Sequence, residues 1–161
     1  MTQIKDMLEI AIKAEIDAAE NYGRAADQTD LFLLRDKFTL LHNEEKGHRR
    51  VLEKLFAKKY PEDEPKLPAS EDMPFKEFSE YAVKPTMQPS EIIEEAMAGE
   101  QRARDFYLEM EKEMDGGKEK AIMRYLASME ESHYFMLKSE LEMAQNFELY
   151  DEVHSMMHVG P

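Results

Sequence analysis

The sequence predicts an all-α protein, a four-helix bundle built from a duplicated helix hairpin. Apolar residues recur every three or four positions along four long stretches, with charged residues between them, and this is the pattern of amphipathic helices. A proline-rich stretch separates the first two helices from the last two, and the second pair repeats residues of the first pair at a constant spacing. These observations indicate one domain with two related halves.

The first predicted hairpin joins two helices through a short polar turn. One helix is expected over residues 2–27, and the second from the turn at residues 27–30 to about residue 60. Thr29 or Asp30 can cap the second helix, because a side-chain oxygen at that place accepts hydrogen bonds from the first free N–H groups. The turn is short, so the two helices are expected to lie side by side.

A long crossover is predicted over residues 61–89. It contains prolines at positions 61, 65, 68, 74, 85 and 89, and proline prevents a long helix because it lacks the backbone N–H group and fixes φ. One short helix is expected within the crossover, around residues 75–83. The crossover therefore connects the two hairpins without adding a fifth long helix.

The second predicted hairpin begins at Pro89-Ser90, which supplies an N-cap, and its first helix is expected to end at Gly116-Gly117. A fourth helix is expected over residues 118–146. We therefore assign residues 1–147 to the bundle and residues 148–161 to a short helical tail. Two tightly joined helices, a long crossover and two more tightly joined helices give the connectivity of a ferritin-like bundle.

A glutamate interrupts each of the four apolar stripes, at a position where the heptad calls for an apolar residue. Buried carboxylates close together are costly unless they are compensated, and two divalent cations would balance four negative charges. Two of these glutamates begin an E-x-x-H sequence, which places Glu and His on one helix face where both can bind the same ion. The predicted ligands of two buried metal ions are Glu15, Glu45, His48, Glu100, Glu130 and His133.

The predicted ligands obey the internal repeat. Positions 15, 45 and 48 correspond to positions 100, 130 and 133, an offset of 85 residues in each case. One E-x-x-H sequence occurs readily by chance in an acidic helical protein, whereas two at a shared offset, each with a matched glutamate on another stripe, indicate a metal site with pseudo-twofold symmetry. The alternative is a bundle whose polar core has lost its metals.

Composition excludes several classes of function. The chain has no cysteine, so thiolate zinc sites, iron–sulfur clusters and cysteine nucleophiles are excluded and metal ligands must be oxygen or nitrogen atoms. A net charge of -14 makes nucleic acid and anionic membranes poor partners. No long apolar stretch and no signal peptide are recognised in the sequence, so we expect a cytoplasmic protein without a membrane span.

Two short motifs carry a resemblance to a known family. Residues 98–100 (Ala-Gly-Glu) and 130–133 (Glu-Glu-Ser-His) resemble those of the ferritin-like di-iron carboxylate proteins, and the rubrerythrin group in particular. The resemblance implies two iron ions bridged by Glu45 and Glu130. It implies that Glu15 and His48 complete one iron site and that Glu100 and His133 complete the other. Manganese is the alternative ion, because hard oxygen and nitrogen sites select weakly between the two.

The resemblance also gives a role to two tyrosines. It implies that Tyr22 and Tyr107, two turns beyond Glu15 and Glu100, are phenols close to the ligands and candidate catalytic residues. The alternative interpretation is a pair of core aromatic residues whose hydroxyl groups bond any acceptor.

The sequence departs from its relatives at three points. Typical rubrerythrins carry a rubredoxin domain whose iron is bound by four cysteines, and these 161 residues contain no cysteine. Rubrerythrins also have a glutamate where this chain has Ala103. Bacterioferritins, which share the six-ligand set, have a haem-binding methionine where this chain has Lys46, so a haem-bridged cage is not expected.

The resemblance implies a rubrerythrin-like peroxidase or oxidase. A reduced di-iron centre would give two electrons to hydrogen peroxide or dioxygen, and a separate donor such as a rubredoxin would reduce it again; a homodimer is expected. The first alternative is a ferroxidase or iron-storage protein, which needs a hollow multi-subunit shell. The second is a non-enzymatic helical module that binds partners through its acidic faces.

Two further groups of residues are weaker candidates for metal ligands. His42 lies one turn before Glu45, but its repeat counterpart is Ala127, so we interpret His42 as a flanking residue. In a helical tail Asp151, His154 and His158 would share one face and could bind a surface metal. A docked or frayed tail is the alternative.

Overall fold

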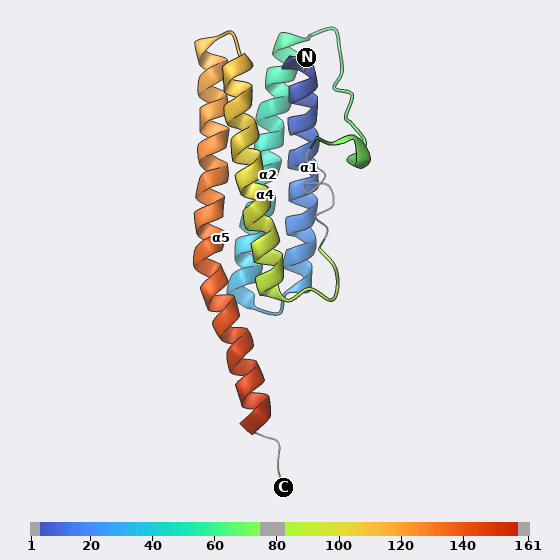
Figure 1. Ribbon diagram of the computed structural model, residues 1–161. Coiled ribbons are helices and arrows are strands. Elements are labelled where there is room, and N and C mark those ends of the chain that lie inside the picture. Colours follow the sequence, from blue (N-terminus) through green and yellow to red (C-terminus); the bar gives the residue numbers. More distant parts are fainter. Residues whose placement is uncertain (1–3, 75–82, 158–161) are drawn as a thin grey trace.

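The computed structural model describes residues 4–74 and 83–157, and within these ranges the chain forms four α helices (Figure 1). Their bounds are α1 Ile4–Gln28, α2 Phe32–Lys59, α4 Pro89–Glu113 and α5 Gly117–Met157. A 3-10 turn, η1, covers Ser70–Asp72 in the crossover. The predicted all-α four-helix bundle is confirmed. The short helix expected around residues 75–83 falls almost entirely on residues 75–82, outside the described part of the chain.

The crossover sets the direction of the second hairpin. Figure 1 shows residues 60–74 leaving the end of α2 and running beside α1, and residues 83–88 leading into α4 at the opposite end of the bundle. The helices α2 and α4 consequently run in the same direction, while each hairpin is antiparallel. This arrangement brings the middle of all four helices to one level.

The starts of α2 and α4 differ from the predicted caps. Leu31 precedes α2, without a side-chain cap, and its backbone N–H donates to the Thr29 hydroxyl oxygen over 3.3 Å. Gln88 precedes α4 and Pro89 opens that helix, which suits proline because the first turn leaves its N–H groups unbonded. The N-cap predicted at Pro89-Ser90 is wrong, because Gln88 occupies that place. The Ser90 amide and hydroxyl groups donate to Glu148 of α5, over 3.0 and 2.7 Å.

The buried apolar side chains form two clusters, one toward each end of the bundle. The first cluster joins the start of α1, the end of α2, the end of α4 and the start of α5. The second joins the end of α1, the start of α2, the start of α4 and the middle of α5. Phe56 and Met123 belong to the first cluster, and Phe38 and Leu137 to the second. A layer in the middle of the bundle therefore lies between two apolar regions.

The last helix is longer than its partners. Residues 148–157, which belong to the predicted tail, continue α5 without a break, and Figure 1 shows this part projecting past the end of the bundle. Its apolar side chains are exposed: Leu149, Tyr150, Val153, Met156 and Met157. None of the described helices is long and apolar enough to cross a membrane.

Candidate metal centre

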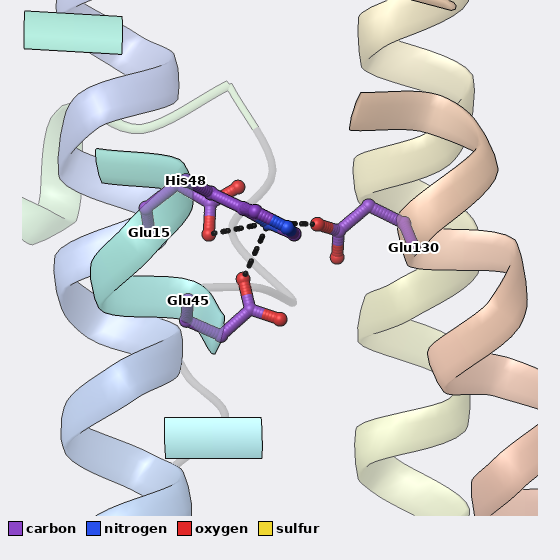
Figure 2. Close-up of side chains that lie close together, drawn as sticks. All are labelled: Glu15, Glu45, His48 and Glu130. Atoms are coloured by element: carbon purple, nitrogen blue, oxygen red, sulfur yellow. Dashed lines mark ion pairs between the residues drawn. The ribbon is translucent and has the colours of Figure 1, made fainter. Parts of the chain in front are cut away.

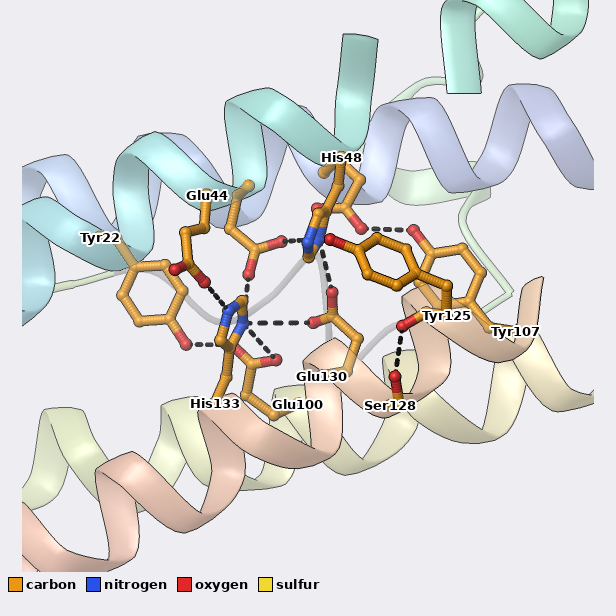
Figure 3. Close-up of polar contacts among 11 residues, drawn as sticks. Tyr22, Glu44, His48, Glu100, Tyr107, Tyr125, Ser128, Glu130 and His133 are labelled. Carbon is orange, nitrogen blue, oxygen red and sulfur yellow. Dashed lines mark hydrogen bonds and ion pairs between the residues drawn. The ribbon is translucent and has the colours of Figure 1, made fainter. Parts of the chain in front are cut away.

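All six predicted ligands lie in the middle layer, and all six are buried. Each helix contributes one of the four predicted glutamates, and α2 and α5 add a histidine each (Figure 2 and Figure 3). The local reason is the register of the helices. Glu45 lies on the face that buries Leu41 and Leu52, and Glu130 on the face that buries Leu126, so the packing of the leucines carries the carboxylates inward.

One group of ligand candidates surrounds His48. Its Nδ1 atom lies 2.8 Å from Glu130 Oε1, 3.5 Å from Glu45 Oε2 and 3.7 Å from Glu15 Oε2 (Figure 2). One ligand atom from each of these four residues lies within 4.8 Å of every other. The group thus offers three carboxylates and one imidazole to a single ion.

The second group surrounds His133 in the same way. Its Nδ1 atom lies 2.9 Å from Glu45 Oε1, 3.5 Å from Glu100 Oε2 and 3.9 Å from Glu130 Oε2. These ligand atoms also fall within 4.8 Å of one another. The structure therefore divides the six predicted residues into two sets of four that share Glu45 and Glu130.

The two shared carboxylates each turn one oxygen toward each histidine. Glu45 presents Oε2 to His48 and Oε1 to His133, and Glu130 presents Oε1 to His48 and Oε2 to His133. This is the arrangement that a carboxylate needs in order to bridge two ions. The bridging role that the sequence implied for these two residues is therefore sterically possible.

Buried polar atoms without a hydrogen bond show that the site fits metal ions. Buried polar groups in proteins are nearly always hydrogen-bonded, yet each of the six residues keeps one buried atom without a hydrogen-bond partner in residues 4–74 and 83–157. These atoms are Glu15 Oε2, Glu45 Oε1, His48 Nδ1, Glu100 Oε2, Glu130 Oε1 and His133 Nδ1. Oxygen and imidazole nitrogen atoms of this kind suit divalent iron or manganese.

The two tyrosines connect the halves of the molecule. The Tyr22 hydroxyl group donates to Glu100 Oε1, and the Tyr107 hydroxyl group donates to Glu15 Oε1 (Figure 3). Each phenol therefore bonds a glutamate of the other hairpin, although in the sequence it follows a glutamate of its own helix. Sequence spacing could not reveal this crossed pairing, because it depends on how α1 and α4 face each other.

Glu44 is a residue of the site that the sequence analysis missed. Its carboxylate accepts a hydrogen bond from His133 Nε2, the ring nitrogen that faces away from the shared glutamates. The only available signal was an acidic residue directly before the E-x-x-H sequence of α2. The repeat gave no support, because the counterpart of Glu44 is Met129.

Without metal, the packing of charges shifts the titration of the glutamates. Burial, followed by the charge of Glu45, raises the pKa of Glu15 well above its usual value. Burial and the charge of Glu100 do the same to the pKa of Glu130. Burial alone would also raise the pKa of Glu45, but its contacts with Glu15 and both histidines hold that pKa far below its usual range.

The pKa values of the two histidines shift in the direction opposite to that of an isolated buried imidazole. Burial alone would lower their pKa values. Contacts with the carboxylates of Glu15 and Glu45 nevertheless raise the pKa of His48 to about 10, and contacts with Glu100 and Glu45 raise that of His133 to about 11. Protons therefore supply part of the positive charge that the carboxylates require.

The remaining candidates lie away from this layer. His42 is half-buried and its Nδ1–H group donates to the Ala19 carbonyl oxygen over 2.6 Å, which agrees with a flanking role. A Cβ atom at Gly23 would lie 3.3 Å from the same ring nitrogen, so glycine leaves room for this contact. In the tail His154 stacks on Tyr150, and His158 lies outside the described residues.

Comparisons with known proteins agree with this geometry. A family model described as Rubrerythrin matches residues 6–141. The fold is similar to that of a hypothetical protein from Pyrococcus furiosus with a TM-score of 0.77 and 30% sequence identity, over 91% of this chain and 92% of that chain. A comparison with curated proteins found no match.

Because Glu130 faces both histidines, its replacement should weaken metal binding. Glu130→Gln keeps the shape of the side chain but removes the anionic oxygens that face both histidines, so we expect the variant to bind at least one ion fewer per chain than the wild type. Metal analysis after anaerobic loading with ferrous iron measures this. Glu131→Gln is the matched control, since Glu131 is the next residue and is exposed. Equal metal content in the two variants would contradict the assignment.

The shifted pKa values predict how the metal-free protein responds to pH. In the folded state Glu15, Glu130 and both histidines bind protons more tightly than in the unfolded chain, so stability falls as pH rises. The depressed pKa of Glu45 acts in the opposite direction, but only below its ordinary value of 4.5. Thermal unfolding should therefore show a higher Tm at about pH 5 than at about pH 8.

Metal should change this pH dependence. Binding an ion requires deprotonated ligands and stabilises the folded state by mass action. The gap in Tm between the loaded and the metal-free protein should consequently widen as pH rises over the same range. A metal-free protein whose Tm increases from about pH 5 to about pH 8 would show that the four glutamates are not crowded together in solution.

Proposed function

The chain belongs to the rubrerythrin family, and from this premise we propose that it is a di-iron carboxylate protein that reduces hydrogen peroxide or dioxygen with electrons from a separate donor protein. Glu15 and His48 would hold one iron, Glu100 and His133 the other, and Glu45 and Glu130 would bridge them. When bound, the two irons supply the two electrons that, with two protons, convert one peroxide molecule into two water molecules. Manganese is the alternative ion.

The observation that carries this proposal is the pair of shared carboxylates, each of which turns one oxygen toward each histidine. A site for a single ion would not need carboxylates that face both histidines. Four carboxylates also match the charge of two divalent ions, so the buried layer becomes neutral when both are bound. Charge neutrality removes most of the cost of burying the glutamates.

The tyrosines would orient the outer ligands. Tyr107 donates to Glu15 Oε1, and Glu15 Oε2, which has no hydrogen bond, faces the first group. Tyr22 donates to Glu100 Oε1, and Glu100 Oε2, which has no hydrogen bond, faces the second. Burial, followed by the charge of Glu15, raises the pKa of Tyr107 well above its usual value. In the metal-free site the Tyr107 phenol is therefore protonated at neutral pH and donates this hydrogen bond.

The space beside the site favours a very small substrate. A cavity of about 20 Å³ is lined by Ala18, Gly99 and Glu130 among others. A second cavity of about 10 Å³ is lined by Ala18, Ala103 and Glu130 among others. One water molecule needs about 10–15 Å³ by the same measure. Molecules with one or two heavy atoms match this space, and an organic substrate of ordinary size does not.

The source of electrons must lie outside these residues. The 161 residues contain no cysteine, so they cannot bind the thiolate iron that accompanies typical rubrerythrins. We propose that the donor is a rubredoxin or a similar small redox protein. Ala103, which stands where rubrerythrins have a further glutamate, lines the smaller cavity and contributes space instead of a ligand.

Rapid mixing tests the reaction class. The protein is loaded with iron, reduced without oxygen and mixed with hydrogen peroxide or, separately, with dioxygen, and the absorbance of the oxidised centre is followed with time. We expect faster oxidation by peroxide, in a particle the size of a dimer. Faster oxidation by dioxygen in a large hollow shell would contradict the proposal and identify a ferroxidase that stores iron.

A further inference from the structure

The two histidines of the site differ in what holds their outer nitrogen atoms. His133 turns Nδ1 toward the shared glutamates and uses Nε2 to donate to the carboxylate of Glu44 (Figure 3). His133 is almost fully buried, whereas the Glu44 side chain is 32% exposed. This contact keeps a proton on Nε2, so Nδ1 is the ring nitrogen that can give its lone pair to a metal ion.

Within residues 4–74 and 83–157, His48 has no equivalent anionic partner. Its ion pairs within the described residues all involve Nδ1, which faces Glu15, Glu45 and Glu130. No carboxylate lies within ion-pair distance of its Nε2 atom in the part of the chain that the structure describes. The two imidazoles therefore present the same inner atom to the site but differ on the outer side.

The sequence explains this difference at one position of the repeat. Glu44 directly precedes the E-x-x-H sequence of α2, and Met129 directly precedes that of α5. Both residues are half-buried, and by the 85-residue offset Met129 is the counterpart of Glu44. A methionine sulfur atom is only a weak acceptor, and it carries no charge that could strengthen a bond from His48.

A carboxylate on the outer nitrogen of a metal-binding histidine orients the ring and makes the inner nitrogen a stronger ligand. Building on the proposed function, we propose that Glu44 makes the two metal positions unequal, so that the ion bound by His133 is held more tightly than the ion bound by His48. Glu44 is thus a positioning residue that acts through His133. The position at His48 is the one that exchanges its ion first.

Glu44→Gln tests this inference, because it keeps the side-chain shape and removes the charge. Metal-free protein is titrated with Mn²⁺ in the absence of oxygen, and electron paramagnetic resonance measures the free ion. The wild type should bind two ions with different affinities, and the variant should lose about 10- to 100-fold in the tighter one. Glu53→Gln is the matched control, since Glu53 lies on the same helix and pairs with Arg49 on the surface.

Variants with a single histidine show which position changes. His48→Ala leaves the position at His133, and adding Glu44→Gln should weaken its binding of Mn²⁺ by about 10- to 100-fold. His133→Ala leaves the position at His48, and adding Glu44→Gln should change nothing there. If Glu44 had a merely structural role, its replacement would weaken Mn²⁺ binding at both positions. If a single-histidine variant fails to fold, the two affinities of the wild type and Glu44→Gln are compared directly, and weakening of the looser ion overturns the inference.

The outcomes separate this inference from the proposed function. Two ions in the wild type, with Glu44→Gln weakening both or neither, would overturn the inequality of the positions and leave the di-metal site intact. Fewer than two ions per chain in the wild type would contradict the proposed function, and the inference would fall with it. Selective weakening of the position at His133 supports both.

Discussion

The burial of four carboxylates in the middle of a helix bundle is the constraint on which the rest of the structure depends. Each isolated buried charge costs several kcal/mol, and neighbouring like charges add repulsion. Two apolar clusters, one toward each end of the bundle, close the fold around this layer. The same apolar stripes that assemble the helices therefore force the glutamates together, and positive charge must enter for the layer to be stable.

Metal ions and protons are alternative sources of that positive charge. In the absence of metal the raised pKa values of Glu15, Glu130 and both histidines keep protons in the layer. Metal binding displaces those protons. The two tyrosines do not supply charge, but they tie the outer glutamate of one hairpin to a helix of the other, so the site also joins the two halves of the bundle.

The six ligand candidates and the fold could be predicted from the sequence because they leave a periodic signal. A glutamate such as Glu130 stands out where leucines recur, and the repeat supplies a second copy of each feature. Contacts between distant helices leave no such signal. Three sets of hydrogen bonds depend on how the helices face one another. They are the crossed bonds of Tyr22 and Tyr107, the bond from His133 to Glu44 and the bonds from Ser90 to Glu148.

The most direct test of the central claim is a crystal structure of the iron-loaded protein with anomalous diffraction measured at the iron absorption edge. Two iron peaks should appear in the middle layer, one beside His48 and one beside His133, with Glu45 and Glu130 in contact with both. A single peak, or peaks that do not contact Glu45 and Glu130, would contradict a shared di-metal site. The same map would show directly whether the carboxylates that the fold buries are the groups that hold the ions.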